Sequence, residues 1–354
     1  MPDDVYSNLK IFHHRERVDA ARSGSHPFPI HVQIIPTNVC NQRCRFCSYR
    51  CPGYSSNETF DPRESIPFPK LAEIINDCED MGVRAIEITG GGEPTCHPQF
   101  LNLCEAILGA EIDLGLVTNG SRWSEDHVRL LSEAKWIRFS IDAGARNTYA
   151  MVRRVKSAVY DQVRAAVRRQ HESRIPEVNQ IIGVGFVVTR DNWSEIAVAA
   201  ERARDDGADN IRISAVFQDK GAAYFDSFGM EAAKLCHQAK DLANERFRVF
   251  DLFSERVHDL VVGRPTRPFC GLQHFVTYIG ADLNVYRCCV VAYNHVGLLG
   301  SIAEVSFREF WQSLQTAKAL DDFDARVCPR CMFNGKNEII AYALSPNPPH
   351  VNFL

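Results

Sequence analysis

The chain has 354 residues, of which 45% are hydrophobic and 24% are charged, and its formal net charge at pH 7 is -4. This composition supports a full core, enough for one large domain and a smaller one, and gives no sign of a basic nucleic-acid-binding surface. No apolar run approaches the roughly 18 residues of a membrane span, and the N-terminus does not resemble a signal peptide. We therefore expect a cytoplasmic protein without a nucleic-acid or membrane partner.

Strands and helices alternate from residue 29 onward. Six β-units separated by helical patterns predict an α/β fold with a parallel sheet, which is too short for a closed eight-stranded barrel. An open, partial barrel and a doubly wound sheet both fit, and in either the functional groups lie at the carboxyl ends of the strands. The expected strands are 31–36, 85–89, 114–118, 136–141, 181–188 and 210–216, and the expected helices are 70–81, 98–109, 124–133, 157–169 and 193–205.

The last third of the chain has a different pattern. Residues 223–264 are helical and charged, and we expect them to form a connector. Alternating runs at 275–279 and 283–287 predict a β-hairpin, and Ser306 is suited to cap a following helix. The expected parts of the chain are an N-terminal extension (1–28), a β/α unit (29–222), the connector (223–264) and a small α+β domain (265–354).

Thirteen cysteines are many for a chain expected in a reducing compartment, where clustered thiols indicate metal or redox chemistry. Cys40, Cys44 and Cys47 have the spacing C-x3-C-x2-C directly after the first strand. Iron–sulfur clusters prefer thiolate ligands, and three thiolates on a cubic cluster leave one iron open for another donor. A structural zinc site is the alternative, but it needs a fourth ligand and no convincing one is nearby. The spacing therefore favours a [4Fe–4S] cluster with one open iron.

The cysteine loop, with Phe46 before its last cysteine, resembles that of the radical S-adenosylmethionine (SAM) superfamily. The resemblance covers residues 29–217 and implies a partial (β/α)6 barrel, in agreement with the β-units counted from the sequence. It also implies that SAM chelates the open iron, accepts one electron and yields a 5′-deoxyadenosyl radical that abstracts hydrogen from the substrate. A flavodoxin or ferredoxin is implied as the reductant.

Further segments at strand ends match this family. Gly91, Gly92, Glu93 and Pro94 resemble its GGEP segment, in which the glycines allow close backbone approach and the glutamate accepts hydrogen bonds from the SAM ammonium group. By resemblance, the remaining SAM-binding candidates are Thr118 and Asn119 after the third strand, Ser140 and Asp142 after the fourth, and Arg153 or Arg154 for the SAM carboxylate. For Thr118 and Asn119 the alternative is an ordinary turn, and for the arginine it is a solvated surface charge.

Four cysteines in the last quarter of the chain form a second group. Cys270, Cys288, Cys328 and Cys331 offer enough thiolates for a closed [4Fe–4S] cluster or a four-cysteine zinc site, and spacing alone does not separate the two. The arrangement resembles the SPASM domain in its shortened twitch form, and is similar to that of the 2-deoxy-scyllo-inosamine dehydrogenases, which implies an auxiliary [4Fe–4S] cluster. Cys289 would face the opposite side of a strand, so we expect Cys288 to be the ligand.

The expected reaction is dehydrogenation of a small polar substrate of sugar, aminocyclitol or nucleoside type, with the auxiliary cluster accepting an electron. Arg212, on the same face of the sixth strand as Ser214, is a candidate to orient the substrate hydroxyl, or else it forms a salt bridge. An epimerase in which Cys289 or Cys96 returns a hydrogen atom is one alternative. A peptide-modifying maturase is another, which the short N-terminal extension disfavours. A zinc-stabilised binding protein is the non-enzymatic alternative.

Overall fold

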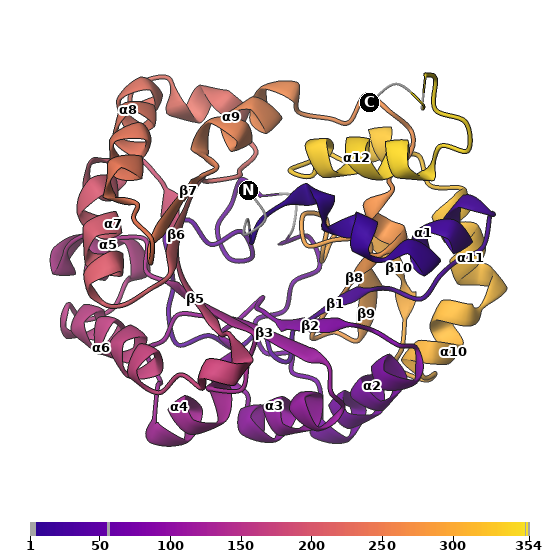
Figure 1. Cartoon of the computed structure of the whole chain (residues 1–354), viewed down its shortest axis with the longest axis horizontal. Helices are drawn as coiled ribbons and strands as arrows, with labels where there is room; N and C mark the ends of the chain where they lie inside the picture. The colour runs from indigo at the N-terminus through magenta and orange to yellow at the C-terminus, as the bar shows by residue number, and fades with distance from the viewer. Residues whose placement is uncertain (1–4, 55–56, 351, 353–354) are drawn as a thin grey trace.

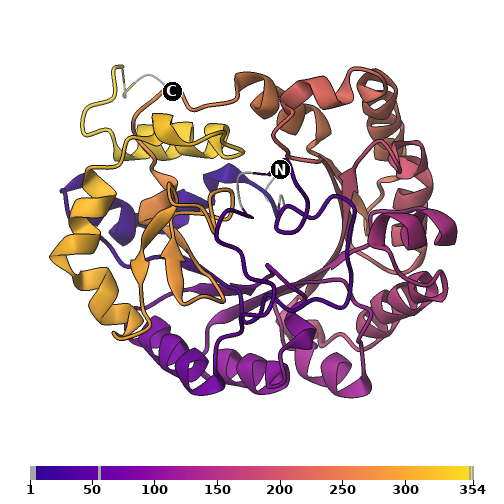
Figure 2. The same ribbon diagram turned by 180° about the vertical axis from the view of Figure 1, so that it is seen from behind.

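The computed structural model describes residues 5–54, 57–350 and 352, so the outermost residues of the expected N-terminal extension and C-terminal domain lie outside it. Its strands form one curved sheet, whose convex face is covered by helices and whose concave face turns toward the interior of an open barrel (Figures 1 and 2). The strands are β1 (His31–Ile34), β2 (Ala85–Ile88), β3 (Asp113–Thr118), β4 (Trp136–Ser140), β5 (Ile181–Val188), β6 (Asn210–Ala215), β7 (Arg248–Asp251), β8 (Val276–Ile279), β9 (Asn284–Tyr286) and β10 (Leu298–Ser301). Their order is β10-β9-β8-β1-β2-β3-β4-β5-β6-β7.

The six β-units expected from the sequence are present. Strands β1 to β6 pair in parallel and in chain order. The helices between and after them are α2 (Phe68–Asp80), α3 (Phe100–Gly109), α4 (Glu125–Leu131), α5 (Arg146–Arg153), α6 (Ala158–Glu172), α7 (Ile196–Asp205), α8 (Gly229–Ala239) and α9 (Phe253–Val262). Helix α5 is not predicted by the sequence, because its eight residues are too few for a clear apolar period. In the described ranges no helix combines the length and apolar character needed to cross a bilayer.

Strand residues alternate between the helix-covered face and the barrel interior. In β6, Ile211 and Ile213 are fully buried beneath the helices, whereas Arg212 between them is only partly buried. Arg138 occupies the equivalent position in β4. Because side chains on a strand alternate in direction, both arginines face the concave side, as the sequence pattern predicts for Arg212.

The sheet continues beyond the barrel at both edges. β7 lies within 223–264, where the sequence predicts only helices, and it pairs in parallel with β6. Its residues are all half-buried, so the segment lacks the apolar alternation that marks a strand. At the other edge, β8 and β9 form the expected hairpin, but β8 also pairs in parallel with β1. The hairpin of the expected C-terminal domain is therefore part of the barrel's own sheet.

The two ends of the chain pack against each other beside β1 and β8. Helices α1 (Arg15–Arg22) and α12 (Asn334–Leu344) lie side by side in both views (Figures 1 and 2). They contribute to a small apolar cluster, separate from the main core, that contains Ile11, Val18, Ile30, Leu272, Phe275, Ile340 and Ala343. The expected N-terminal extension is thus packed onto the C-terminal part of the chain.

Helix ends in the C-terminal part follow the sequence signals. Ser306 caps α10 (Phe307–Gln312), because its Oγ accepts a hydrogen bond from the Glu309 amide at 3.2 Å and Glu309 bonds back to the Ser306 amide. Helix α11 (Leu314–Asp321) follows directly. The cap predicted at Ser306 is confirmed.

Candidate cluster and cofactor site

The cysteine loop leaves β1 and crosses the carboxyl ends of the strands. On one side, the amide of Glu93 donates to the carbonyl of Val39 at 2.9 Å. On the other, the amide of Arg45 donates to the carbonyl of Val152, near the end of α5, at 2.8 Å. The three cysteines are therefore held between the segment after β2 and the end of α5.

The glycines of the GGEP segment make this packing possible. A Cβ atom on Gly92 would lie 2.2 Å from the carbonyl oxygen of Val39, and one on Gly91 would lie 2.2 Å from Oδ1 of Asn38. No real Cβ tolerates such contacts without a shift of the loop. The glycines thus allow a close backbone approach, as expected, and the segment that approaches them is the cysteine loop.

Replacing Gly92 by alanine should displace the cysteine loop. We expect an overpacking cost of about 1–3 kcal/mol and loss of iron from the first cluster site, measured by denaturant unfolding and iron analysis. Gly109→Ala is the matched control, since a Cβ there meets nothing within 4 Å. If Gly92→Ala kept both its stability and its iron, the packing argument would be wrong.

Glu93 is buried, and donors surround its carboxylate. Oε1 accepts from the hydroxyls of Thr118 at 2.6 Å and Thr95 at 2.8 Å, and Oε2 accepts from the amide of Asn119 at 2.7 Å. Burial raises the pKa of Glu93, and these hydrogen bonds act in the opposite direction. Among the described contacts Oε2 accepts a single hydrogen bond, so it retains capacity for an ammonium donor. Thr118 and Asn119 accordingly support Glu93.

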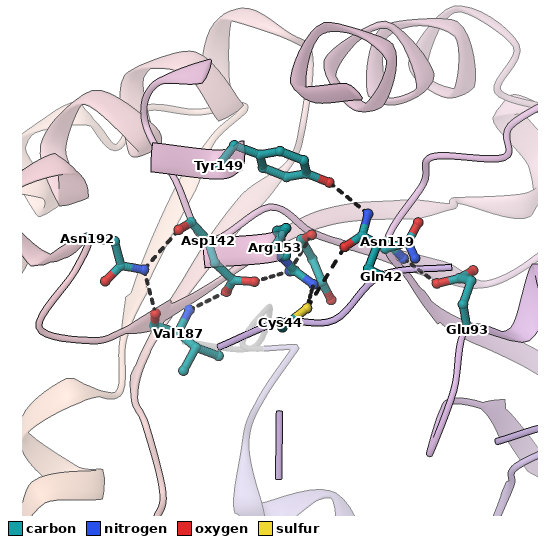
Figure 3. Close-up of polar contacts among 10 residues, drawn as sticks. Gln42, Cys44, Glu93, Asn119, Asp142, Tyr149, Arg153, Val187 and Asn192 are labelled. Carbon is teal, nitrogen blue, oxygen red and sulfur yellow. Dashed lines mark hydrogen bonds and ion pairs between the residues drawn. The ribbon is translucent and has the colours of Figure 1, made fainter. Parts of the chain in front are cut away.

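The structure separates the two arginine candidates. Arg153 is 6% exposed, whereas Arg154 is exposed at the end of α5. Arg153 forms an ion pair with the buried Asp142, donates to the carbonyl of Ser140 at 2.6 Å and donates to Sγ of Cys44 at 3.3 Å. Figure 3 shows how this guanidinium joins the end of β4 to the cysteine loop. Ser140 takes part through its backbone carbonyl.

Asp142 ties the end of β4 to β5. Its φ of +56° is in the left-handed region, which is strained for a residue other than glycine. Oδ1 accepts from the amide of Val187 at 2.6 Å, and Nδ2 of Asn192 donates to the carbonyls of Asp142 and Val187, each at 2.9 Å (Figure 3). Burial raises the pKa of Asp142, and the Arg153 guanidinium lowers it. The network holds this strained residue against the site.

Sequence reasoning misses Gln42, Tyr149 and Asn41, which support the site. Gln42 is 3% exposed and donates through Nε2 to the hydroxyl of Tyr149 at 3.2 Å. Oδ1 of Asn41 accepts from Nδ2 of Asn119 at 2.9 Å. Phe46, which the sequence does single out, lies with its ring 5.6 Å from the Arg153 guanidinium. Two of the missed residues lie between cluster cysteines, and polar residues at those positions were the available signal.

The donors of the cysteine loop fit an iron–sulfur cluster. Burial raises the pKa of Cys40 to about 12 and that of Cys47 to about 11, so these thiols need a metal in order to ionise at neutral pH. Cys44 lies beside a guanidinium, which stabilises negative charge on its sulfur. The thiol of Cys51 is turned to the carbonyl of Cys44, at 3.4 Å. Over the described residues, no group of three or more His, Cys, Asp or Glu side chains surrounds a single ion position.

The four C-terminal cysteines also lie close to one another. Cys270 and Cys288 pack in the same apolar cluster. Burial raises the pKa of Cys328 to about 12, with further contributions from Cys270 and then Cys331. Sγ of Cys331 accepts from the amide of Phe333 at 3.3 Å, the kind of hydrogen bond that tunes cluster sulfurs. Four partly buried thiols with such a donor fit a closed cluster.

Cys288 and Cys289 diverge, but for a reason other than the one expected. Both follow the end of β9 and lie in a turn, so strand alternation does not apply to them. Cys288 packs in the apolar cluster of the auxiliary cysteines. Cys289 packs against a second cluster, and the charges of Glu87 and Arg212 act on its thiol. Cys289 therefore faces the barrel interior.

Cys288→Ala should lower the iron and sulfide content of the reconstituted protein by the amount of one [4Fe–4S] cluster per chain, because it deletes one of four thiolate ligands. Cys289→Ala should leave the iron and sulfide content unchanged. The measurement is iron and acid-labile sulfide per chain. The reverse outcome would assign Cys289 as the ligand.

Cys96 lies apart from these groups. It ends the short turn η3 (Pro94–Cys96), and its Sγ accepts from Nη1 of the exposed Arg122 at 3.7 Å. None of the described side-chain contacts joins Cys96 to the cysteine loop or to Arg212. The structure does not bring Cys96 together with the other catalytic candidates.

Comparison with known proteins identifies the barrel. Residues 34–202 match the profile of the Radical SAM superfamily. This segment has the fold of a radical SAM domain. Such domains use a [4Fe–4S] cluster and SAM, and relatives of the SPASM type carry auxiliary clusters. The expected cofactors are confirmed at this level.

Two curated proteins are similar in sequence to this chain. A tungsten-containing aldehyde ferredoxin oxidoreductase cofactor-modifying protein of Pyrococcus furiosus is 24% identical over 238 residues, 63% of this chain and 64% of that protein. The match thus spans less than two thirds of that relative. The mycofactocin maturase MftC of Mycolicibacterium smegmatis is 24% identical over 318 residues, 86% of this chain and 75% of the relative.

Solved structures confirm the expected α/β radical SAM fold. Streptococcus suis SuiB bound to its precursor peptide SuiA has a TM-score of 0.63 at 15% identity, covering 91% of this chain and 73% of that chain. The narrower resemblance to the 2-deoxy-scyllo-inosamine dehydrogenases has only a distant structural match, BtrN with a TM-score of 0.44. That subgroup assignment is therefore not supported.

Proposed function

We propose that the protein is a radical SAM enzyme that abstracts hydrogen from a peptide and so modifies it. The observation that carries the proposal is the meeting of the cysteine loop with Glu93 and with the Arg153–Asp142 pair at the carboxyl ends of the strands. The bound [4Fe–4S] cluster and SAM supply a 5′-deoxyadenosyl radical. Cys40, Cys44 and Cys47 would hold that cluster.

Protein groups on two sides of the loop would bind the methionine part of SAM. Glu93 would accept from its ammonium group through Oε2. Nε of Arg153 is buried and has no hydrogen-bond partner among the described residues, so it would donate to the SAM carboxylate. Asp142 keeps this guanidinium charged and oriented.

A peptide substrate is favoured over the small molecule expected from the sequence. The expectation of a small substrate rested on the short N-terminal extension, and that of dehydrogenation on an auxiliary cluster that accepts an electron. The relatives do not support a small-molecule dehydrogenase. Mycofactocin maturase aligns with most of this chain, and the SuiB structure of the same fold holds a precursor peptide. Cys270, Cys288, Cys328 and Cys331 are proposed to hold an auxiliary cluster, and a flavodoxin or ferredoxin is the proposed reductant.

The test is anaerobic turnover with SAM, dithionite and a pool of synthetic peptides, compared with a pool of sugars and nucleosides. We expect peptides to raise 5′-deoxyadenosine formation above the substrate-free rate and to yield products of altered mass. In deuterated water, a peptide that gains one deuterium through Cys289 would indicate epimerisation, and one lighter by two hydrogens would indicate oxidation. Stimulation by sugars or nucleosides and by no peptide would contradict the proposal.

A further inference from the structure

Two arginines inside the barrel lack an acidic partner. Arg138 in β4 and Arg212 in β6 each lie two residues before the polar residue near the strand's carboxyl end, Ser140 and Ser214, on the side of the SAM site. Among the described residues, neither guanidinium takes part in a hydrogen bond or an ion pair. Nε of Arg212 is one of the buried polar atoms left without a partner. An unpaired buried charge is costly, so its presence calls for a ligand.

Aromatic rings hold both guanidiniums in place. The Arg138 guanidinium lies 5.3 Å from the ring centre of Trp136, and that of Arg212 lies 5.6 Å from the ring centre of Tyr6. Such cation–π contacts attract the guanidinium to the ring. The N–H groups at its edge stay free for planar acceptors.

The strand between the two arginines carries no side chains at the facing positions. Gly183 of β5 is the register partner of Arg138, and Gly185 is the register partner of Arg212. A Cβ atom on Gly185 would lie 3.4 Å from Cδ of Arg138, so any larger side chain would press on the arginine. The side chain of Arg138 therefore lies over Gly185, the register partner of Arg212, so the two arginines come together across β5.

The charges around the two arginines are mainly positive. Glu87 faces them from β2 and its charge acts on Arg212, whereas Asp142 is paired with Arg153 at the strand end. Two further cations lie in this region. Arg256 is paired with Asp259 at 2.6 Å, and Lys336 of α12 interacts electrostatically with Glu87, Cys289 and Arg256. Burial, and then Arg138, lower the pKa of Arg212 to about 10, so it remains charged at neutral pH.

We infer that Arg138 and Arg212 together bind an oxyanion of the substrate. This inference deepens the proposed function and rests on it, since the anion would anchor the substrate below the bound SAM. Guanidinium groups match the planar geometry of carboxylate and phosphate, and two of them bracket such a group from both sides. The carboxylate of an acidic or C-terminal peptide residue is one source, and the phosphate of a smaller substrate is the other.

The test measures binding to the full-length, reconstituted, SAM-loaded protein by calorimetry. The probes are N-acetyl-Ala-Glu-Ala-amide, its Gln counterpart and inorganic phosphate. We expect the Glu peptide or phosphate to bind at least tenfold more tightly than the Gln peptide, and the tighter of the two identifies the source. The advantage should disappear in Arg138→Gln and Arg212→Gln and persist in Arg129→Gln, which alters an arginine that is 82% exposed. No advantage, or one that survives both interior substitutions, overturns the inference.

A stability measurement covers the case in which a variant binds nothing. Arg212→Met should melt about 2 °C higher than the parent, because it removes an unpaired charge from the interior. A structural role predicts a fall of several degrees, which would overturn the inference. Failure of the proposed function is distinguishable, because it appears as a lack of peptide-stimulated 5′-deoxyadenosine formation and leaves these binding and melting results as they are.

Discussion

Replacing Cys44 by alanine should abolish the release of 5′-deoxyadenosine. With two thiolates the loop cannot retain a [4Fe–4S] cluster that leaves one iron for SAM. We expect SAM cleavage to fall by about a thousandfold or more, the order of loss that follows removal of an essential catalytic group. Iron and sulfide should fall by one cluster per chain, because the C-terminal thiols are unchanged. The measurement is anaerobic turnover with product quantification, together with metal analysis.

Cys51→Ser is the matched control for that variant. Cys51 follows the same loop, and its thiol donates to the carbonyls of Cys44 and Arg45, at 3.4 Å and 3.3 Å. A serine hydroxyl can make the same hydrogen bonds, so cluster content and SAM cleavage should stay at the parent level. Full SAM cleavage by Cys44→Ala, or loss of the first cluster in Cys51→Ser, would contradict the assignment of the ligands.

Replacing Arg153 by methionine should both destabilise the protein and weaken SAM binding. The substitution leaves the carboxylate of Asp142, which is 2% exposed, without its ion-pair partner. Breaking a buried pair from one side costs about 3–5 kcal/mol, and we expect a loss of this size in the free energy of unfolding. SAM binding should weaken because the guanidinium is the proposed partner of the SAM carboxylate. Denaturant unfolding and equilibrium dialysis with labelled SAM measure the two effects.

Two further variants separate the structural from the binding role. Arg154→Met alters the adjacent, exposed arginine and should change the free energy of unfolding by less than about 0.5 kcal/mol. The double variant Arg153→Met with Asp142→Asn removes both charges, so it should recover part of the lost stability without recovering SAM binding. Normal SAM affinity in that double variant would show that Arg153 acts only as a structural group.

The sequence predicts the barrel well because its strands have a clear burial pattern, which alternates in β1, β2 and β4 and is almost continuous in β3, β5 and β6. The same principle fails for β7, whose residues RVFD lie at an edge and are evenly half-buried. It also fails for the merging of the hairpin with the barrel, since the pairing of β8 with β1 joins segments about 245 positions apart (276 − 31). Long-range strand pairing leaves no local signal in the chain.

Site residues are predictable where a local motif carries them. The cysteine spacing and the GGEP segment locate the cluster loop and Glu93 from the sequence. The choice between Arg153 and Arg154 depends on which one faces inward at the end of α5, and neighbouring identical residues offer no basis for it. Arg138 is not predicted as a site residue, because its inferred role depends on a glycine on the next strand and on Arg212 one strand further away.

Electron–nuclear double resonance on the reduced protein, with SAM carrying 15N in its methionyl amino group, tests most directly whether this loop holds a SAM-binding cluster. Cys288→Ala would remove the signal of the proposed auxiliary cluster from the spectrum. We expect a hyperfine coupling between the remaining cluster and the labelled nitrogen, and its loss when Cys44 is replaced by alanine. A fully assembled cluster at Cys40, Cys44 and Cys47 that shows no coupling to labelled SAM would contradict it.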